Sequence, residues 1–164
     1  MLPHNYGIIL DMKEKINFKY NDGGRALVGF KGDTGDCVVR AICIVSDLPY
    51  QQVYDDLTSL TKKWRSESNS RAAWNAKPKN DSARNGSFKD VYKPYLERLG
   101  WTWTPTMFIG SGCKVHLKAD ELPKGKIICS VSRHLVAVVD GIIQDTYDCS
   151  RDGTRCVYGY FTKV

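Results

Sequence analysis

The stretch GDTGDCVVRAICIV, residues 32–45, places a cysteine behind two glycines and two aspartates and in front of an apolar run. These residues predict a helix over 36–46, with Asp36 as the N-cap and Cys37 in the first turn. A thiol there lies among unpaired backbone N–H groups at the positive end of the helix dipole, and both favour the thiolate. The pattern predicts that Cys37 is a nucleophile, against the alternative of a small buried hydrophobic residue.

A nucleophilic thiol needs a base, and the chain contains three histidines. His4 lies near the start of the chain, and His116 follows a glycine-rich turn. His134 opens the otherwise apolar stretch HLVAVV. A single histidine in a strand is more often structural than catalytic, so His134 needs a second argument.

The register of a predicted hairpin provides that argument. Asp140-Gly141 is a favoured two-residue turn, which pairs Val139 with Ile142. Counting outward, His134 and Asp145 fall on the same face at diagonal positions, about 7–8 Å apart at the backbone. Asp145 is therefore predicted to orient the imidazole, provided that no bulge interrupts the strand.

Four residues before the thiol are the predicted oxyanion and cleft residues: Asp33, Thr34, Gly35 and Asp36. Backbone N–H groups at the start of a helix can hold a developing oxyanion, and the Thr34 hydroxyl is a further donor. Gly35 leaves room for a substrate. A carboxylate beside a thiolate raises the pKa of the thiol, so we expect Asp36 to contribute by capping the helix.

The rest of the sequence predicts a single α+β domain over residues 1–164. A hairpin is predicted over 16–30, because Asn21-Asp22-Gly23-Gly24 is a strong turn signal. Further helices are predicted over 49–65 and, capped by Ser87, over 88–100. The polar segment 66–86 is predicted to be a mobile loop or insertion that contains Trp74. The last third of the chain predicts an antiparallel sheet.

Composition restricts the partners. The formal net charge of +6 favours an acidic partner or surface, whereas the dispersed lysines and arginines argue against nucleic acid. No apolar run reaches the length of a membrane span, and no secretory signal opens the chain. We therefore expect no membrane association, a cytosolic location and six reduced cysteines. No cofactor motif is present, and we expect no cofactor.

The order Cys37, His134, Asp145 resembles that of the papain-like cysteine peptidase superfamily. The segment SRHLVAVVDGIIQDTYD looks like the histidine and aspartate strands of bacteriocin-leader-processing peptidases. TGDCVVRAI looks like the cysteine motif of ovarian-tumour-type deubiquitinases. Two positions depart from these families: Lys31 stands where papain-type enzymes carry an oxyanion-donating glutamine, and Thr34 stands where the ovarian-tumour pattern has aspartate. The chain also resembles sequences of phages and bacteria, which implies a bacterial or host cytoplasm.

The resemblance implies a papain-like fold, in which a helical part carries the nucleophile at a helix N-terminus and packs on a C-terminal antiparallel sheet. It also implies a Cys-His-Asp triad that cleaves a peptide or isopeptide bond in a protein or peptide substrate through a thioester. Glutamine deamidation and acyl transfer use the same groups.

Two other classes remain open. One is a non-catalytic protein-binding module on the same fold. The other is a zinc protein that uses Cys113, His116, Cys149 and Cys156, of which the first two have a metal-like spacing.

Overall fold

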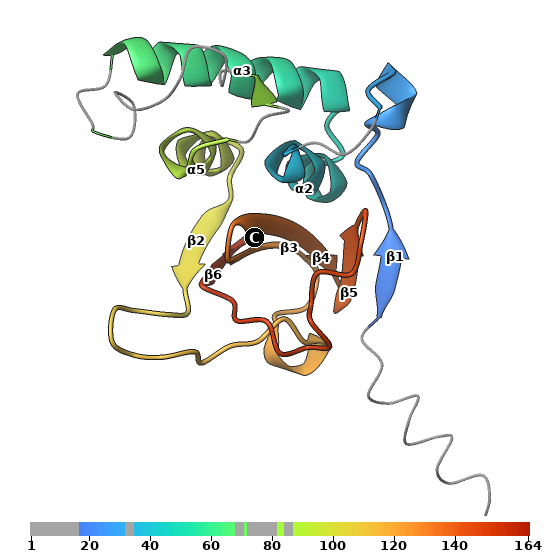
Figure 1. Ribbon diagram of the computed structural model, residues 1–164, viewed down its shortest axis with the longest axis vertical. Coiled ribbons are helices and arrows are strands. Elements are labelled where there is room, and N and C mark those ends of the chain that lie inside the picture. Colours follow the sequence, from blue (N-terminus) through green and yellow to red (C-terminus); the bar gives the residue numbers. More distant parts are fainter. Residues whose placement is uncertain (1–16, 32–34, 68–70, 72–81, 84–86) are drawn as a thin grey trace, which may run out of the picture.

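The structure is a computed structural model that describes residues 17–31, 35–67, 71, 82–83 and 87–164. Within these ranges the chain has an α+β architecture, with three α-helices on one side of a six-stranded sheet (Figure 1). Helices α2 (Cys37–Ser46) and α5 (Lys89–Arg98) lie next to the sheet, and α3 (Tyr50–Glu67) packs across them from outside. The predicted α+β class is confirmed.

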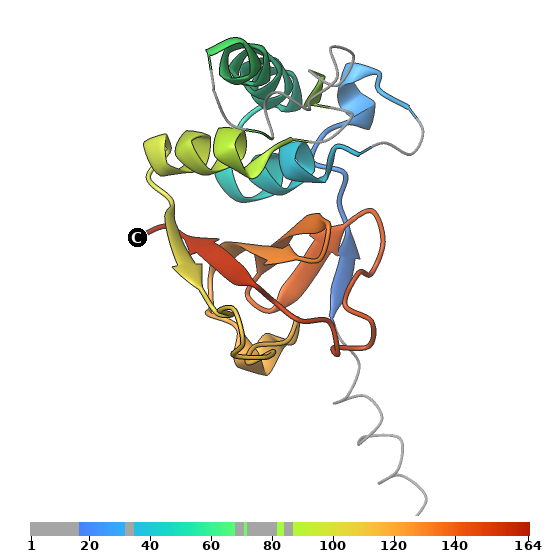
Figure 2. The same ribbon diagram turned by 60° about the vertical axis from the view of Figure 1, so that its left-hand side comes forward.

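The sheet is mixed, not purely antiparallel. Its strand order is β1-β5-β4-β3-β6-β2. The strands are β1 (Phe18–Tyr20), β2 (Thr102–Pro105), β3 (Lys126–Val131), β4 (His134–Val139), β5 (Ile142–Asp145) and β6 (Gly159–Thr162). Strand β1 pairs in parallel with β5, whereas the other neighbours are antiparallel. The sheet curls strongly, so that its outer strands bend away from the helices (Figure 2).

Helix α2 is the central element of the fold. All its residues from Val38 to Val45 are buried, as expected for a helix that is apolar nearly all round. It packs chiefly on β4 and also contacts α3. The helix begins at Cys37 with Asp36 at the N-cap position, but the Asp36 side chain makes no capping hydrogen bond. The predicted helix is therefore confirmed, and the capping role of Asp36 is wrong.

The hairpin between β4 and β5 has the predicted register. Val139 pairs with Ile142, and the ladder continues through Ala137 and Gln144. Asp140-Gly141 forms the turn, with both residues at positive φ (50° and 78°) as such turns require. His134 begins β4 and Asp145 ends β5, so the two residues lie at neighbouring strand ends. In this register their side chains point to the same face of the sheet.

The prediction of a hairpin over 16–30 is wrong, because the described residues of this range form one strand and then a short helix. After β1, the side chains of Asn21 and Asp22 accept hydrogen bonds from the N–H groups of Gly23 and Gly24, each at 2.9 Å. These local bonds turn the chain into a short 3-10 helix, η1 (Ala26–Val28), in place of a second strand. Strand β1 pairs with β5 instead.

The remaining irregular segments also differ from expectation. Helix α3 continues to Glu67, into the predicted loop 66–86. Near the C-terminal end of the segment 66–86, the Ser82 hydroxyl lies 2.8 Å from the Tyr54 hydroxyl on α3. The neighbouring Ala83 is buried, and its N–H donates a hydrogen bond to Thr58 of α3. The other loop residues, Trp74 included, lie outside the described residues except for position 71. Ser87 does not cap α5, which begins at Lys89 with Phe88 as its N-cap residue.

Cys113 and Cys156 form a disulfide across 43 positions of sequence. The expectation of six reduced thiols is therefore wrong for this pair. The cytosolic location stays a prediction. Cys37, Cys43, Cys129 and Cys149 are free. Among the helices in the described ranges, none has the length and apolar character that crossing a bilayer requires.

Candidate active site

Two of the three predicted triad side chains are joined by a short hydrogen bond. His134 Nε2 lies 2.6 Å from Asp145 Oδ2, and both side chains are buried, at 8% and 3% exposure. The Tyr147 ring packs beside the imidazole, with 5.5 Å between ring centroids. The register of the hairpin explains this geometry, because it brings the two strand ends together.

The third side chain, Cys37, meets the same imidazole from the N-terminus of α2. Burial raises the pKa of Cys37, but the hydrogen bond and the charge of His134 outweigh it, so that the pKa falls below the usual 9.0. A hydrogen bond from the Leu135 backbone and the charge of Arg40 act in the same direction. The structure thus brings the side chains of Cys37, His134 and Asp145 together.

The pKa of His134 changes in the complementary direction. Burial lowers it, but hydrogen bonds to Asp145, Cys149 and Cys37 outweigh burial and raise the pKa to about 12. Burial likewise raises the pKa of Asp145, and the bonds to His134 more than reverse this, so that it lies below 3.8. These directions favour the ionised forms of Cys37, His134 and Asp145.

Arg40 connects the nucleophile helix to the triad aspartate. Its Nη2 lies 3.1 Å from Asp145 Oδ1, and its Nη1 binds Asp36. Asp36 also accepts hydrogen bonds from Tyr50 (2.6 Å) and Arg25 (3.2 Å). A cation between two buried carboxylates offsets the cost of burying all three charges. This network fixes Asp145 from the side opposite His134.

The network corrects the assignment of Asp36 as a cleft residue. Asp36 is fully buried, and its carboxylate is engaged by Arg40, Tyr50 and Arg25. Because it does not cap α2, none of the described residues accepts a hydrogen bond from the N–H of Cys37. That N–H group is a candidate oxyanion donor.

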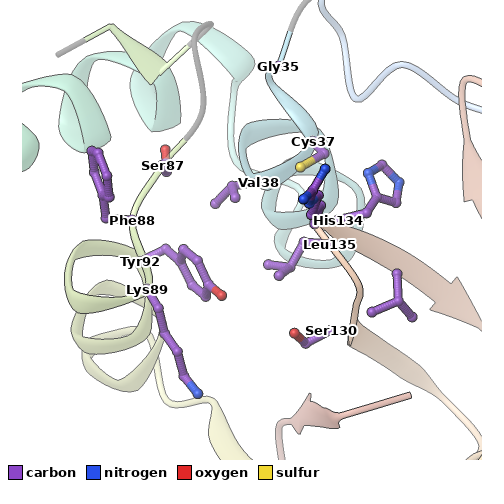
Figure 3. A pocket seen from close by; sticks show the side chains of 12 residues that line it. Gly35, Cys37, Val38, Ser87, Phe88, Lys89, Tyr92, Ser130, His134 and Leu135 are labelled. Carbon is purple, nitrogen blue, oxygen red and sulfur yellow. The ribbon is translucent and has the colours of Figure 1, made fainter. Parts of the chain in front are cut away.

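A cavity of about 530 Å³ opens directly on the thiol. Figure 3 shows Cys37 and His134 on one wall and Phe88, Lys89 and Tyr92 of the α5 segment on the opposite wall. Gly35 lines the cavity, as predicted for a cleft residue, whereas Asp33 and Thr34 lie outside the described residues. Burial, with the charge of Cys37, raises the pKa of Tyr92 to about 12, which keeps its hydroxyl neutral.

The candidate zinc ligands are not assembled. Cys113 and Cys156 are bonded to each other, and His116 Nδ1 lies 3.2 Å from Glu121 Oε1. Cys149 is buried next to His134 instead. These four residues, which were one of the alternatives, therefore do not form a zinc site.

A different trio of groups has the donor types that a metal could use. Ligand atoms of His134, Asp145 and Cys149 lie within 4.8 Å of one another. However, His134 and Asp145 already bind each other, and the positive guanidinium of Arg40 lies on the other oxygen of Asp145. This environment favours the hydrogen-bonded pair over a cation.

Sequence reasoning missed Arg40, Tyr50 and Cys149 as parts of the site. A signal for Arg40 was present, because it is the only charged residue in an otherwise apolar, buried helix and follows Asp36 by four positions. Tyr50 and Cys149 had no such signal, since their contacts depend on how α3 and the segment after β5 pack.

Comparisons with family models, with curated proteins and with solved structures found no match to this chain. The functional argument therefore depends on the geometry of the site.

Proposed function

We propose that the protein is a cysteine hydrolase that cleaves a peptide or isopeptide bond through a thioester intermediate. One observation carries the proposal: an imidazole bound to Asp145 at 2.6 Å lies beside the Cys37 thiol, whose pKa it lowers, and both His134 and Cys37 line an open cavity. A nucleophile, a base and an orienting carboxylate in this order are the groups that acyl transfer requires.

The chemistry follows from the positions of these groups. The Cys37 thiolate attacks the carbonyl carbon, and the N–H at the start of α2 stabilises the oxyanion. The imidazolium of His134 protonates the leaving nitrogen, the C–N bond breaks, and a thioester remains on Cys37. A water molecule then gives a proton to His134 and attacks the thioester, which releases a carboxylic acid and restores the Cys37 thiolate beside the imidazolium.

The papain-like assignment of the fold is part of this proposal. It is supported by a nucleophile at the first position of a buried helix, by the packing of that helix on the strand of His134, and by the chain order of the triad. The mixed sheet, with β1 added in parallel beside β5, differs from the purely antiparallel sheet expected.

The cavity supports a protein or peptide substrate over a small metabolite. Cys37 lines the cavity, together with the apolar side chains of Val38 and Phe88. Ser130 and Tyr92, which carry hydroxyl groups, also line it. Lys89 stands at its edge, above the Trp103 ring at 4.7 Å. A mixed surface of this kind suits an extended chain with an acidic residue.

The test is a digestion of a diverse pool of synthetic peptides that includes isopeptide-linked members, followed by mass spectrometry of the new termini. We expect new termini with the wild-type protein and none with Cys37→Ala. Cys43→Ala is the matched control, because Cys43 lies on the same helix but is buried, and burial raises its pKa to about 12. Equal product patterns from the wild type and Cys37→Ala would exclude the proposed hydrolase and favour a binding module.

A further inference from the structure

A second cavity, of about 610 Å³, borders the imidazole of His134 but not Cys37. Tyr147, Cys149 and three arginines line it: Arg133, Arg151 and Arg155. His134 and Arg133 also line the cavity that contains the thiol, so the two cavities share one boundary. The second cavity is therefore adjacent to the candidate site, with His134 and Arg133 between them.

The position of this cavity identifies which part of a substrate it would hold. After the attack, the acyl part of the substrate stays on Cys37, in the first cavity. The leaving group takes a proton from His134, so it must lie on the side of the imidazole. The second cavity is on that side, and the ring of Tyr147 forms part of its wall.

The arginines of this cavity have few acidic partners. Among the described residues, none of Arg133, Arg151 and Arg155 forms an ion pair with a carboxylate. The single aspartate in the lining, Asp148, already accepts hydrogen bonds from the backbone and hydroxyl of Ser150, at 3.0 and 2.6 Å. The cavity thus carries a surplus of positive charge.

Arg155 makes this a formed site and not a mobile cluster of surface charges. It is 9% exposed, and it donates hydrogen bonds to the backbone oxygens of Cys149 and Ser132. These bonds join the turn that carries Arg133 to the segment that carries Arg151. The Nε of Arg155 is also buried and has no hydrogen-bond partner among the described residues.

From this geometry we infer that the second cavity binds a carboxylate on the leaving-group side of the substrate. The carboxylate belongs either to an acidic side chain just after the scissile bond or to the free C-terminus of the substrate. Arginine suits this task because its planar group binds a carboxylate through two hydrogen bonds. The assignment to the leaving group rests on the proposed hydrolase function.

Binding can be tested without turnover in the Cys37→Ala protein, by NMR titration of the arginine side-chain resonances with three dipeptides. Glycylglutamate amide carries only a side-chain carboxylate, glycylglutamine only a terminal one, and glycylglutamine amide neither. We expect at least one of the first two to bind about tenfold or more tightly than the third. The tighter of the two identifies the source of the carboxylate.

Arg151→Gln is the informative variant, because Arg151 is exposed and its replacement should leave the fold intact. It should weaken carboxylate binding toward the level of glycylglutamine amide. Arg98→Gln is the matched control, because it removes the same charge from the exposed face of α5, outside both cavities, and should change nothing. Equal binding of all three dipeptides would overturn the inference.

The peptide digestion separates this inference from the proposed function. Cleavage before an acidic residue or close to the C-terminus supports both. Cleavage without such a preference keeps the hydrolase and overturns the carboxylate site. If carboxylates bind but Cys37 cleaves nothing, the cavity is an anion site and the leaving-group assignment is wrong.

Discussion

Arg40 Nη2 lies 3.1 Å from Asp145 Oδ1, so the helix that carries the nucleophile also holds the aspartate of the candidate triad. The two residues are 105 positions apart in sequence and both are buried. The same guanidinium binds Asp36, next to Cys37. The distance between thiol and histidine is therefore tied to the docking of α2 on the sheet.

Replacing Arg40 should lower stability strongly. Arg40→Met removes the cation that two buried carboxylates share, and the loss of one partner of a buried ion pair costs about 3–5 kcal/mol. We expect a corresponding fall in the free energy of unfolding, measured by urea denaturation. Arg25→Lys is the control, because Arg25 contacts Asp36 but does not contact Asp145; it should cost less.

Arg40→Lys tests whether Arg40 also positions the site. Lysine keeps the charge but cannot bridge both carboxylates in the same way. If Arg40 is a positioning residue, the pKa of Cys37 should rise in this variant while the protein stays folded. An unchanged Cys37 pKa in folded Arg40→Lys would mean that the arginine is only structural.

The His134–Asp145 pair should make stability depend on pH. The pKa of His134 is raised in the folded protein, from 6.5 to about 12. Its contribution is therefore complete below pH 6.5 and decreases as the pH rises toward the folded value. We expect the stability difference between the wild type and His134→Gln to be largest near pH 6 and to shrink in alkaline solution. A difference that grows with pH would contradict the ionised pair.

The disulfide between Cys113 and Cys156 should stabilise the fold. It closes a long loop that joins the segment after β2 to the segment before β6. Cys113→Ser with Cys156→Ser should lower the free energy of unfolding by about 2–4 kcal/mol, and dithiothreitol should do the same to the wild type. Alkylation of the unreduced, denatured protein should modify four cysteines; modification of all six would show that the bond is absent.

Gly159 should tolerate no side chain. A Cβ atom at this position would lie 2.4 Å from the Trp103 ring and 2.8 Å from the Thr104 carbonyl oxygen. Gly159→Ala should therefore destabilise the protein by about 1–3 kcal/mol in thermal or urea unfolding. In a Trp103→Leu background the cost should fall, because the smaller side chain removes part of the clash. An equal cost in both backgrounds would place the strain elsewhere.

Local signals in the sequence predicted the parts of the site that lie on regular elements. The apolar run after Cys37 predicts a buried helix, and Asp140-Gly141 sets the register that joins His134 to Asp145. The helix and the hairpin each involve residues within about a dozen positions of one another, so the local sequence pattern is enough to predict them.

The failures concern long-range contacts. Asn21 and Asp22 signal a turn, but they do not show that β1 pairs with a strand more than a hundred positions away. The Asp36 carboxylate binds Arg40 and Tyr50 and does not cap α2. Its contact with Tyr50 depends on the packing of α3, which the local sequence does not show. The arginines of the second cavity come from two separate segments, so only the folded chain shows them as one group.

The pH dependence of Cys37 alkylation tests the central claim most directly. Iodoacetamide labelling of the native protein, followed by mass spectrometry of the Cys37 peptide, gives a rate at each pH for the wild type and His134→Gln. We predict a midpoint below 9.0 in the wild type and a shift to higher pH in the variant. Identical profiles, or a wild-type midpoint at or above 9.0, would contradict a thiolate paired with the imidazolium of His134.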